Sequence, residues 1–301
     1  MIKPDDSYLP ADRLIAVRKE AERALNAADA FGVFPTPVDQ IMETAKIILA
    51  PHDAFDDGLI SKFRKKFGNK LKQALSKVLG LFDATAKVVY IDKAILAVRQ
   101  TFVKLHETAH SILPWQRKLY AVVEDCEQTI QPELADEFER EANVFATEVL
   151  FQCDTFSKEA AQHTFGINTP LKLSKKYGAS IYSSVRRYVR TNHRVCAVLV
   201  LNPPEFVLGN GFTATLRRIE VSDGFASKFG QISWPTQFTP DDSIGAMVPV
   251  GCRKFSKPRR IVITDANGCD HECIVEAFTQ TYQVFILICH SGALNKKIVV
   301  F

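Results

Sequence analysis

The sequence predicts an α+β protein whose helices and strands are largely segregated along the chain. Helical periodicity dominates up to about residue 192, and only one pair of short β-prone runs, at residues 80–92, interrupts it. After Val195 the chain changes to β-rich runs separated by Gly, Pro, Asn and Asp. At 301 residues the chain is too long for one ordinary core. These observations place a domain boundary near residue 193.

The first elements are two helices, a basic segment and a hairpin. Residues 11–32 have helical periodicity, and Thr36-Pro37 is a good start for a second helix. Residues 62–77 carry seven bases and no acid, and their apolar residues recur in four-residue steps, which predicts a helix with a charged outer face. Residues 80–92, GLFDATAKVVYID, read as a β-hairpin.

The hairpin is followed by a series of helices. The first runs from about residue 94 to 113 and stops before Pro114, because proline disfavours helical geometry in the residue before it. Pro132 begins the next helix, PELADEFEREANVFATEVLFQ. Further helices fit residues 154–165 and the basic segment 168–191, which reads as helix, turn and helix.

The first of these helices contains His106-Glu107-Thr108-Ala109-His110, a match to the pattern H-E-x-x-H. A helix places residues i and i+4 on one face, so His106 and His110 can share a metal ion. Glu107 is rotated by about 100° and is placed to accept a proton from a metal-activated water. The pattern has only three fixed positions, so the competing interpretation is a surface helix with solvated imidazoles. A suitable third ligand would decide between them.

Acidic residues on the helix at 133–151 are the candidates for that third ligand. A buried stripe is expected at Leu134, Phe138, Ala142, Phe145 and Val149. Four acids lie away from this stripe and are expected to be solvated: Glu133, Asp136, Glu137 and Glu148. Glu139 and Glu141 lie at the two margins of the stripe. Periodicity favours Glu139 slightly, because small Ala146 on its side leaves room for a metal, and Glu141 stays an alternative.

The stretches LHETAHSIL and EREANVFATEVL together resemble the ImmA/IrrE metallopeptidases, which pair H-E-x-x-H with a downstream E-x-x-A-N-x-F-A helix. The resemblance implies a mainly helical, zincin-like peptidase domain with a small sheet at residues 1–153. A helix-turn-helix-like segment is implied at 154–192, and a β-rich α/β domain at 193–301. For the last domain, a GAF-like sensory fold and a plain dimerisation or docking module are both open.

The same resemblance implies a chemistry. Zn²⁺ would be held by His106, His110 and Glu139, with Glu107 as the general base, in a zinc-dependent endopeptidase of narrow specificity. The implied protein substrate is a DNA-binding, helix-turn-helix transcriptional repressor, whose cleavage would relieve repression. Two alternatives are a DNA-binding or sensory regulator with a non-catalytic zinc site and a toxin–antitoxin component. Family members often continue with Leu-Met-Pro where this chain has Leu150-Phe151-Gln152, which bears on the substrate pocket.

Two further sets of residues are candidates for partner binding. The predicted hairpin could hold an extended substrate by strand addition at Lys87 and Val89. The helix-turn-helix-like segment offers bases for DNA phosphates or, as the favoured alternative, for structural use or protein docking. These bases are Lys172, Lys175, Lys176, Arg186, Arg187 and Arg190.

Nothing in the sequence predicts export or membrane insertion. The N-terminus, MIKPDDSYLPADRL, has acids where a secretory signal has bases and then an apolar core. No apolar run reaches the roughly 18 residues needed to span a bilayer. The odd number of cysteines, seven, favours reduced and buried thiols over disulfides. The stretch CDHEC at 269–273 is too crowded to favour a second metal site. A cytoplasmic protein with no membrane contact is expected.

Overall fold

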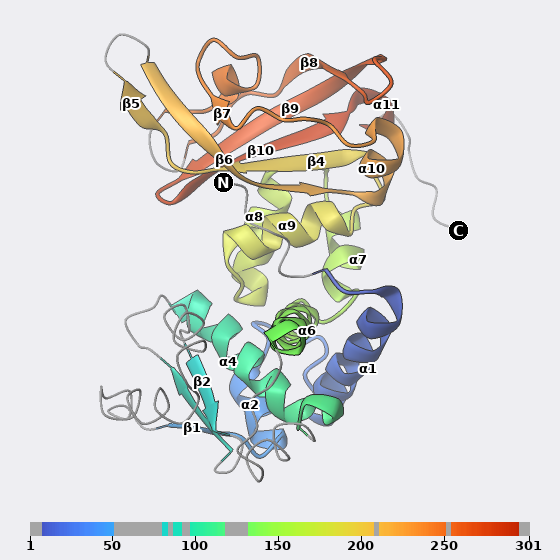
Figure 1. Cartoon of the computed structure of the whole chain (residues 1–301), viewed down its shortest axis with the longest axis vertical. Helices are drawn as coiled ribbons and strands as arrows, with labels where there is room; N and C mark the ends of the chain where they lie inside the picture. The colour runs from blue at the N-terminus through green and yellow to red at the C-terminus, as the bar shows by residue number, and fades with distance from the viewer. Residues whose placement is uncertain are drawn as a thin grey trace. The chain divides into compact units, whose positions relative to one another are not determined.

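The computed structural model describes residues 8–50, 80–83, 87–91, 97–117, 132–207, 211–250 and 254–294. These residues form helices and mainly antiparallel sheets, which confirms the predicted α+β class (Figure 1). The helix expected at 62–77 lies outside the described residues. Within the described part of the chain, no helix is both long enough and apolar enough to cross a membrane.

The structure divides into two compact units. One unit contains residues 5–156 together with 174–180, and the other contains 1–4, 157–173 and 181–301. The division passes through helices α7 (Thr155–Ala161) and α8 (Asn168–Tyr177), whereas helix α9 (Ile181–Arg190) lies wholly in the second of these units. Each unit is described separately below.

The N-terminal unit is built around two helices, α4 (Ala97–Ile112) and α6 (Pro132–Leu150), which pack side by side (Figure 1). Helix α1 (Ala11–Ala27) packs on α6, and α2 (Val38–Thr44) packs on α4. Helix α4 ends before Pro114, as predicted, and residues 114–117 form a separate helical turn. On α6 the residues Phe138, Ala142, Phe145 and Val149 are buried, so the predicted apolar stripe forms the contact face of this helix.

A small sheet lies against α4 in the order β1-β3-β2. Strands β2 (Gly80–Asp83) and β3 (Val88–Ile91) are antiparallel, as the predicted hairpin requires. Strand β1 (Ile48–Leu49) pairs in parallel with the other side of β3. Strand β3 is therefore the middle strand of this sheet.

The C-terminal unit contains a larger sheet in the order β5-β6-β4-β10-β9-β8, with β7 also paired to β6 (Figure 1). All of its strands are antiparallel to their neighbours. Their bounds are β4 (Cys196–Leu201), β5 (Glu205–Val207), β6 (Gly211–Val221), β7 (Gln237–Phe238), β8 (Arg259–Thr264), β9 (Asp270–Gln280) and β10 (Gln283–His290). Short helical segments complete the unit: α10 (Asp223–Phe229), η1 (Gly245–Met247) and α11 (Ser291–Leu294).

Both faces of this sheet are covered. One face packs against Phe225 and Phe229 of α10, and these rings stack at 4.3 Å between centroids. The other face carries helix α9, whose Val185, Tyr188 and Val189 are buried. Strands β4 and β10 are buried on both faces, which explains their continuous apolar sequences.

A β-bulge in β6 changes which side chains face α9. The register with β4 shifts between Val200 and Leu201. Leu216 of β6 therefore belongs to the hydrophobic core that also contains the phenylalanines of α10. Arg218 and Glu220, which follow the shift, are buried but do not belong to that core. Glu220 thereby meets α9, where it accepts a 2.7 Å hydrogen bond from Arg186 Nε and lies 3.9 Å from Arg190 Nε. Two bases of the helix-turn-helix-like segment are thus used to hold α9 on the sheet.

We expect Glu220→Ala to lower the free energy of unfolding by about 3 kcal/mol, because it leaves the guanidinium of Arg186, whose side chain is only 15% exposed, without its carboxylate. Urea denaturation would measure this change. The matched control is Glu272→Ala, which breaks an exposed 2.9 Å pair with Arg260 on the same sheet and should change stability by less than about 0.5 kcal/mol. Equal effects of the two substitutions would contradict a stabilising role for the Arg186–Glu220 pair.

Candidate metal centre

The predicted metal ligands meet where α4 packs on α6. His106 Nε2 lies 3.1 Å from Glu139 Oε2, and His110 Nε2 lies 3.6 Å from Glu139 Oε1. One ligand atom from each of the three side chains lies within 4.8 Å of the others, and no other group of three among the described residues offers such a set. The Glu139 side chain is 55% exposed, whereas those of His106 and His110 are 14% and 7% exposed. The group is therefore open to solvent on the Glu139 side.

Both imidazoles are oriented by a hydrogen bond at the opposite ring nitrogen. His106 Nδ1 lies 3.1 Å from Asn143 Oδ1, and His110 Nδ1 lies 2.7 Å from Gln116 Oε1. An amide oxygen can only accept, so each neutral histidine carries its proton on Nδ1 and presents the Nε2 lone pair. This arrangement, in which an outer partner fixes the tautomer, is typical of metal-binding histidines.

The donor set fits zinc. Two imidazole nitrogens, one carboxylate and a remaining open position are the ligands of a catalytic zinc site. Tetrahedral coordination with bonds of about 2.0–2.1 Å separates two ligand atoms by about 3.3 Å. The observed separations of 3.1 and 3.6 Å lie on either side of that value. The same three side chains could hold the ion with little movement.

The electrostatics of the group also suit a divalent cation. Desolvation opposes ionisation of Glu139, but its hydrogen bond with His106 and the charges of both histidines lower its pKa to about 2. Desolvation opposes charge on His106 too, yet the contact with Glu139 and the carboxylate of Glu107 raise its pKa overall. Desolvation, aided by the charge of His106, lowers the pKa of His110. An ionised carboxylate therefore faces two imidazoles.

Glu107 lies beside the ligands without belonging to them. It is 8% exposed, and its helical neighbours Leu105, Thr108 and Ala109 are completely buried. Burial raises the pKa of Glu107 to about 7, with the charge of His106 acting in the opposite direction. A carboxyl group with a pKa near neutrality can both accept and return a proton, which is what a general acid–base catalyst requires.

The other acids of α6 have different tasks. Glu141, the alternative third ligand, is completely buried and accepts 2.7 Å hydrogen bonds from Trp115 Nε1 and Gln116 Nε2. Glu148 was expected to be solvated, and this expectation is wrong: it is 5% exposed, and its carboxylate lies 3.5 Å from Arg18 Nε. Arg18 of α1 crosses this part of α6, which the sequence of α6 alone does not reveal.

The predicted substrate strand needs correction. Val89 is completely buried, and the carbonyl groups of Lys87 and Val89 accept hydrogen bonds from Ile48 and Ala50. Strand β3 has a partner on each side, so these two residues do not form an edge to which a peptide could pair. The prediction failed because β1, about 40 residues earlier in the chain, completes the sheet.

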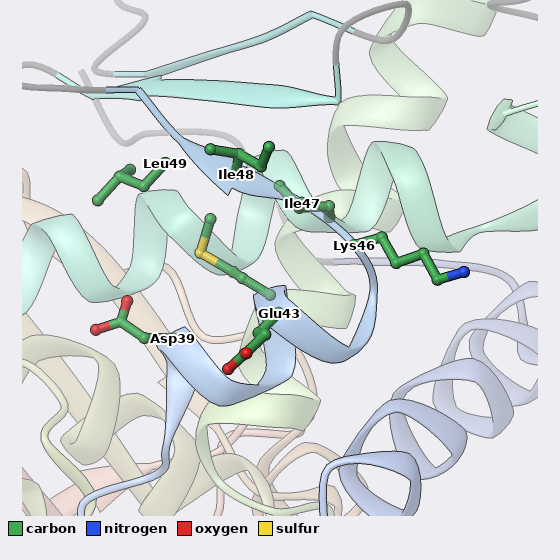
Figure 2. A pocket seen from close by; sticks show the side chains of 7 residues that line it. Asp39, Glu43, Lys46, Ile47, Ile48 and Leu49 are labelled. Carbon is green, nitrogen blue, oxygen red and sulfur yellow. The ribbon is translucent and has the colours of Figure 1, made fainter.

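A shallow pocket lies at the outer side of β1, between this strand and α2 (Figure 2). Its lining residues are Asp39, Met42, Glu43, Lys46, Ile47, Ile48 and Leu49. Asp39 is paired with Lys104 of α4 at 2.5 Å. None of the predicted site residues lines this pocket.

The basic residues of the helix-turn-helix-like segment are not a uniform surface. Arg186 and Arg190 are engaged with Glu220. The ammonium of Lys176 lies 4.2 Å from the centroid of the Phe34 ring, and Lys172 and Lys175 are exposed. In the stretch CDHEC at 269–273, which is too crowded to favour a metal, Cys273 is buried, Cys269 is exposed, and His271 pairs with Asp265.

Two residues at the site were not predicted as functional. Asn143 lies four residues after Glu139, so helical spacing already placed it on the same side. Gln116 follows the proline break after α4, and no sequence signal connects it with His110.

Comparison with known proteins identifies the part of the chain that contains the site. Residues 60–187 match the Peptidase_M78 family model, described as the IrrE N-terminal-like domain. This region is similar to the IrrE N-terminal-like domain. The match contains His106, Glu107, His110 and Glu139, and the family indicates a metallopeptidase-type domain. The resemblance drawn from the two sequence motifs is confirmed.

Structure comparison extends the likeness beyond this domain. A Mycobacterium tuberculosis transcriptional regulator is similar in fold, with a TM-score of 0.53 and 12% sequence identity over 98% of this chain and 95% of that chain. No curated protein matches the sequence. At this identity the likeness to the regulator concerns the fold alone.

The matched region departs from the expected Leu-Met-Pro at Leu150-Phe151-Gln152, and these residues have a structural use. Phe151 is completely buried and packs edge-on against Phe156 at 4.7 Å between ring centroids. The side chain of Gln152 donates to the carbonyl of Val33 and accepts from Gly32 N. The side chain of Gln152 therefore anchors the loop between α1 and α2.

Proposed function

We propose that the protein is a zinc-dependent endopeptidase of narrow specificity. The observation that carries the proposal is the convergence of His106, His110 and Glu139 beside a buried Glu107. His106 and His110 lie on one face of α4, and Glu139 lies on α6. Both helices belong to a region that matches a metallopeptidase family.

Each side chain has a defined task in hydrolysis. His106 Nε2, His110 Nε2 and one Glu139 oxygen would bind zinc, which when bound supplies Lewis-acid activation of water and of the peptide carbonyl. Glu107 accepts the proton of the attacking water on a carboxylate oxygen and passes it to the nitrogen of the leaving amine. The buried surroundings of Glu107 keep competing water away from this carboxyl group.

The proposed substrate is a DNA-binding, helix-turn-helix transcriptional repressor, which cleavage would inactivate. Support comes from the transcriptional regulator with a similar fold and from the narrow specificity that the resemblance to the ImmA/IrrE metallopeptidases implies. A regulator that binds zinc without catalysis is the second candidate, favoured by the same neighbour. Glu107 separates the two, because a structural zinc site has no use for a buried general base beside the ion.

We expect the zinc-loaded protein to cut the repressor encoded nearest to its gene into a small number of discrete fragments. Incubation of the two purified proteins, followed by mass spectrometry of the products, would measure this. A chelator should stop cleavage, and added zinc should restore it, since the three ligands hold the ion reversibly. An intact repressor at full zinc occupancy would contradict the proposed substrate. Cleavage that persists without metal would contradict the zinc mechanism.

A further inference from the structure

The side chain of Gln116 is oriented without ambiguity by its three contacts. Its nitrogen Nε2 lies 2.7 Å from Glu141 Oε2 and 3.2 Å from the carbonyl oxygen of Phe138, both of which are acceptors here. Only the amide nitrogen can donate to them, so the amide oxygen must be the atom that lies 2.7 Å from His110 Nδ1. Gln116 is completely buried, so water does not compete for these positions.

Glu141 holds the side chain of Gln116 in this orientation. It is completely buried, and its Oε2 accepts from both Gln116 Nε2 and Trp115 Nε1 at 2.7 Å. Its second oxygen lies 3.7 Å from a guanidinium nitrogen of Arg13 on α1. A buried carboxylate oxygen with two short hydrogen bonds holds both of its N–H donors in place. It therefore determines which end of the Gln116 amide faces His110.

We propose that Gln116 and Glu141 are positioning residues that set the tautomer and ring orientation of His110 for zinc. This inference rests on the proposed function. It gives Glu141, which does not bind the metal, a role in that function. Glu141 acts through two hydrogen bonds: it fixes Gln116, and Gln116 keeps the proton of His110 on Nδ1. The Nε2 lone pair is thereby directed at the ion. Loss of such an outer partner weakens metal binding by about 10–100-fold.

The test compares zinc affinity, by competition with a chelator, in full-length variants. Gln116→Met keeps the size of the side chain and removes both its acceptor and its donors, so zinc affinity should fall by about 10–100-fold. The visible spectrum of the cobalt-substituted protein should change as well, because it reports the geometry of the ligands. The matched control is Gln40→Met on α2, which removes a 2.9 Å side-chain hydrogen bond to the carbonyl of Ala28 at the end of α1. It should leave zinc affinity and the cobalt spectrum unchanged.

A second pair of variants tests Glu141 itself. Glu141→Gln keeps an oxygen that accepts from Trp115 and Gln116, so its zinc affinity should stay within about threefold of the wild type. Glu141→Leu removes the acceptor and should reproduce the loss seen with Gln116→Met. Should Gln116→Met fail to fold, Gln116→Asn serves the same purpose, since its shorter side chain cannot reach both His110 and Glu141.

A purely structural role gives a different result. If Gln116→Met or Gln116→Asn loses thermal stability but binds zinc as tightly as the wild type with an unchanged cobalt spectrum, the inference is overturned. Failure of the proposed function gives another result. A wild-type protein that binds zinc at this site and cuts no protein contradicts the peptidase proposal. The zinc affinities of the variants still decide the role of Gln116 and Glu141.

Discussion

We expect Glu107→Gln to reduce the proposed peptide hydrolysis by about 10²–10⁴-fold and to leave zinc bound. Glutamine has nearly the same size and can occupy the same buried position, but its amide cannot accept a proton from water at neutral pH. The ligand atoms belong to His106, His110 and Glu139, so the ion does not depend on residue 107. Single-turnover cleavage assays and metal analysis of the same preparation would measure both effects.

The control for this substitution is Glu133→Gln, which removes one exposed carboxylate from the first turn of α6 and should leave both quantities unchanged. Retention of full activity by Glu107→Gln would show that another group acts as the base. Loss of zinc from this variant would show instead that Glu107 is a ligand.

Glu139→Ala removes a carboxylate that reaches both histidines and should weaken zinc binding by more than about 100-fold, beyond the range for an outer partner. Cleavage should disappear with the metal. The effect on the fold should be small, because the side chain is 55% exposed and belongs to the open side of the group. Zinc content per chain and chelator competition would measure the loss.

The neighbouring acid provides the matched comparison. Glu141→Gln lies two residues along the same helix and should retain zinc, because Glu141 binds Trp115 and Gln116 rather than the metal position. The reverse outcome, in which Glu139→Ala keeps zinc and Glu141→Gln loses it, would mean that the two carboxylates exchange roles in the metal-bound protein.

Local patterns in the sequence predicted the elements that carry the site. The four-residue spacing of His106 and His110, the proline after Leu113 and the apolar stripe of α6 are properties of single helices, and periodicity reveals them. The choice between Glu139 and Glu141 is different. Both lie at margins of the stripe, and which margin faces α4 depends on how two helices pack. The resemblance to a known family, rather than periodicity, pointed to Glu139.

Three structural features that sequence reasoning missed depend on contacts between distant segments. Glu148 is buried because Arg18, 130 residues earlier, lies against it. Strand β3 is not an edge because Ile48 and Leu49 pair with it from before the hairpin. Arg186 faces a carboxylate because a bulge in β6 turns Glu220 towards α9. None of these partners is adjacent in sequence, and no periodic pattern encodes them.

The most direct test of the central claim is anomalous diffraction at the zinc absorption edge from crystals of the full chain grown with zinc. One strong peak per chain is expected, about 2.0–2.1 Å from His106 Nε2, His110 Nε2 and a Glu139 oxygen, with a further position open to solvent. A fully occupied ion held by other residues, or an ion whose fourth position is filled by a protein side chain, would contradict it.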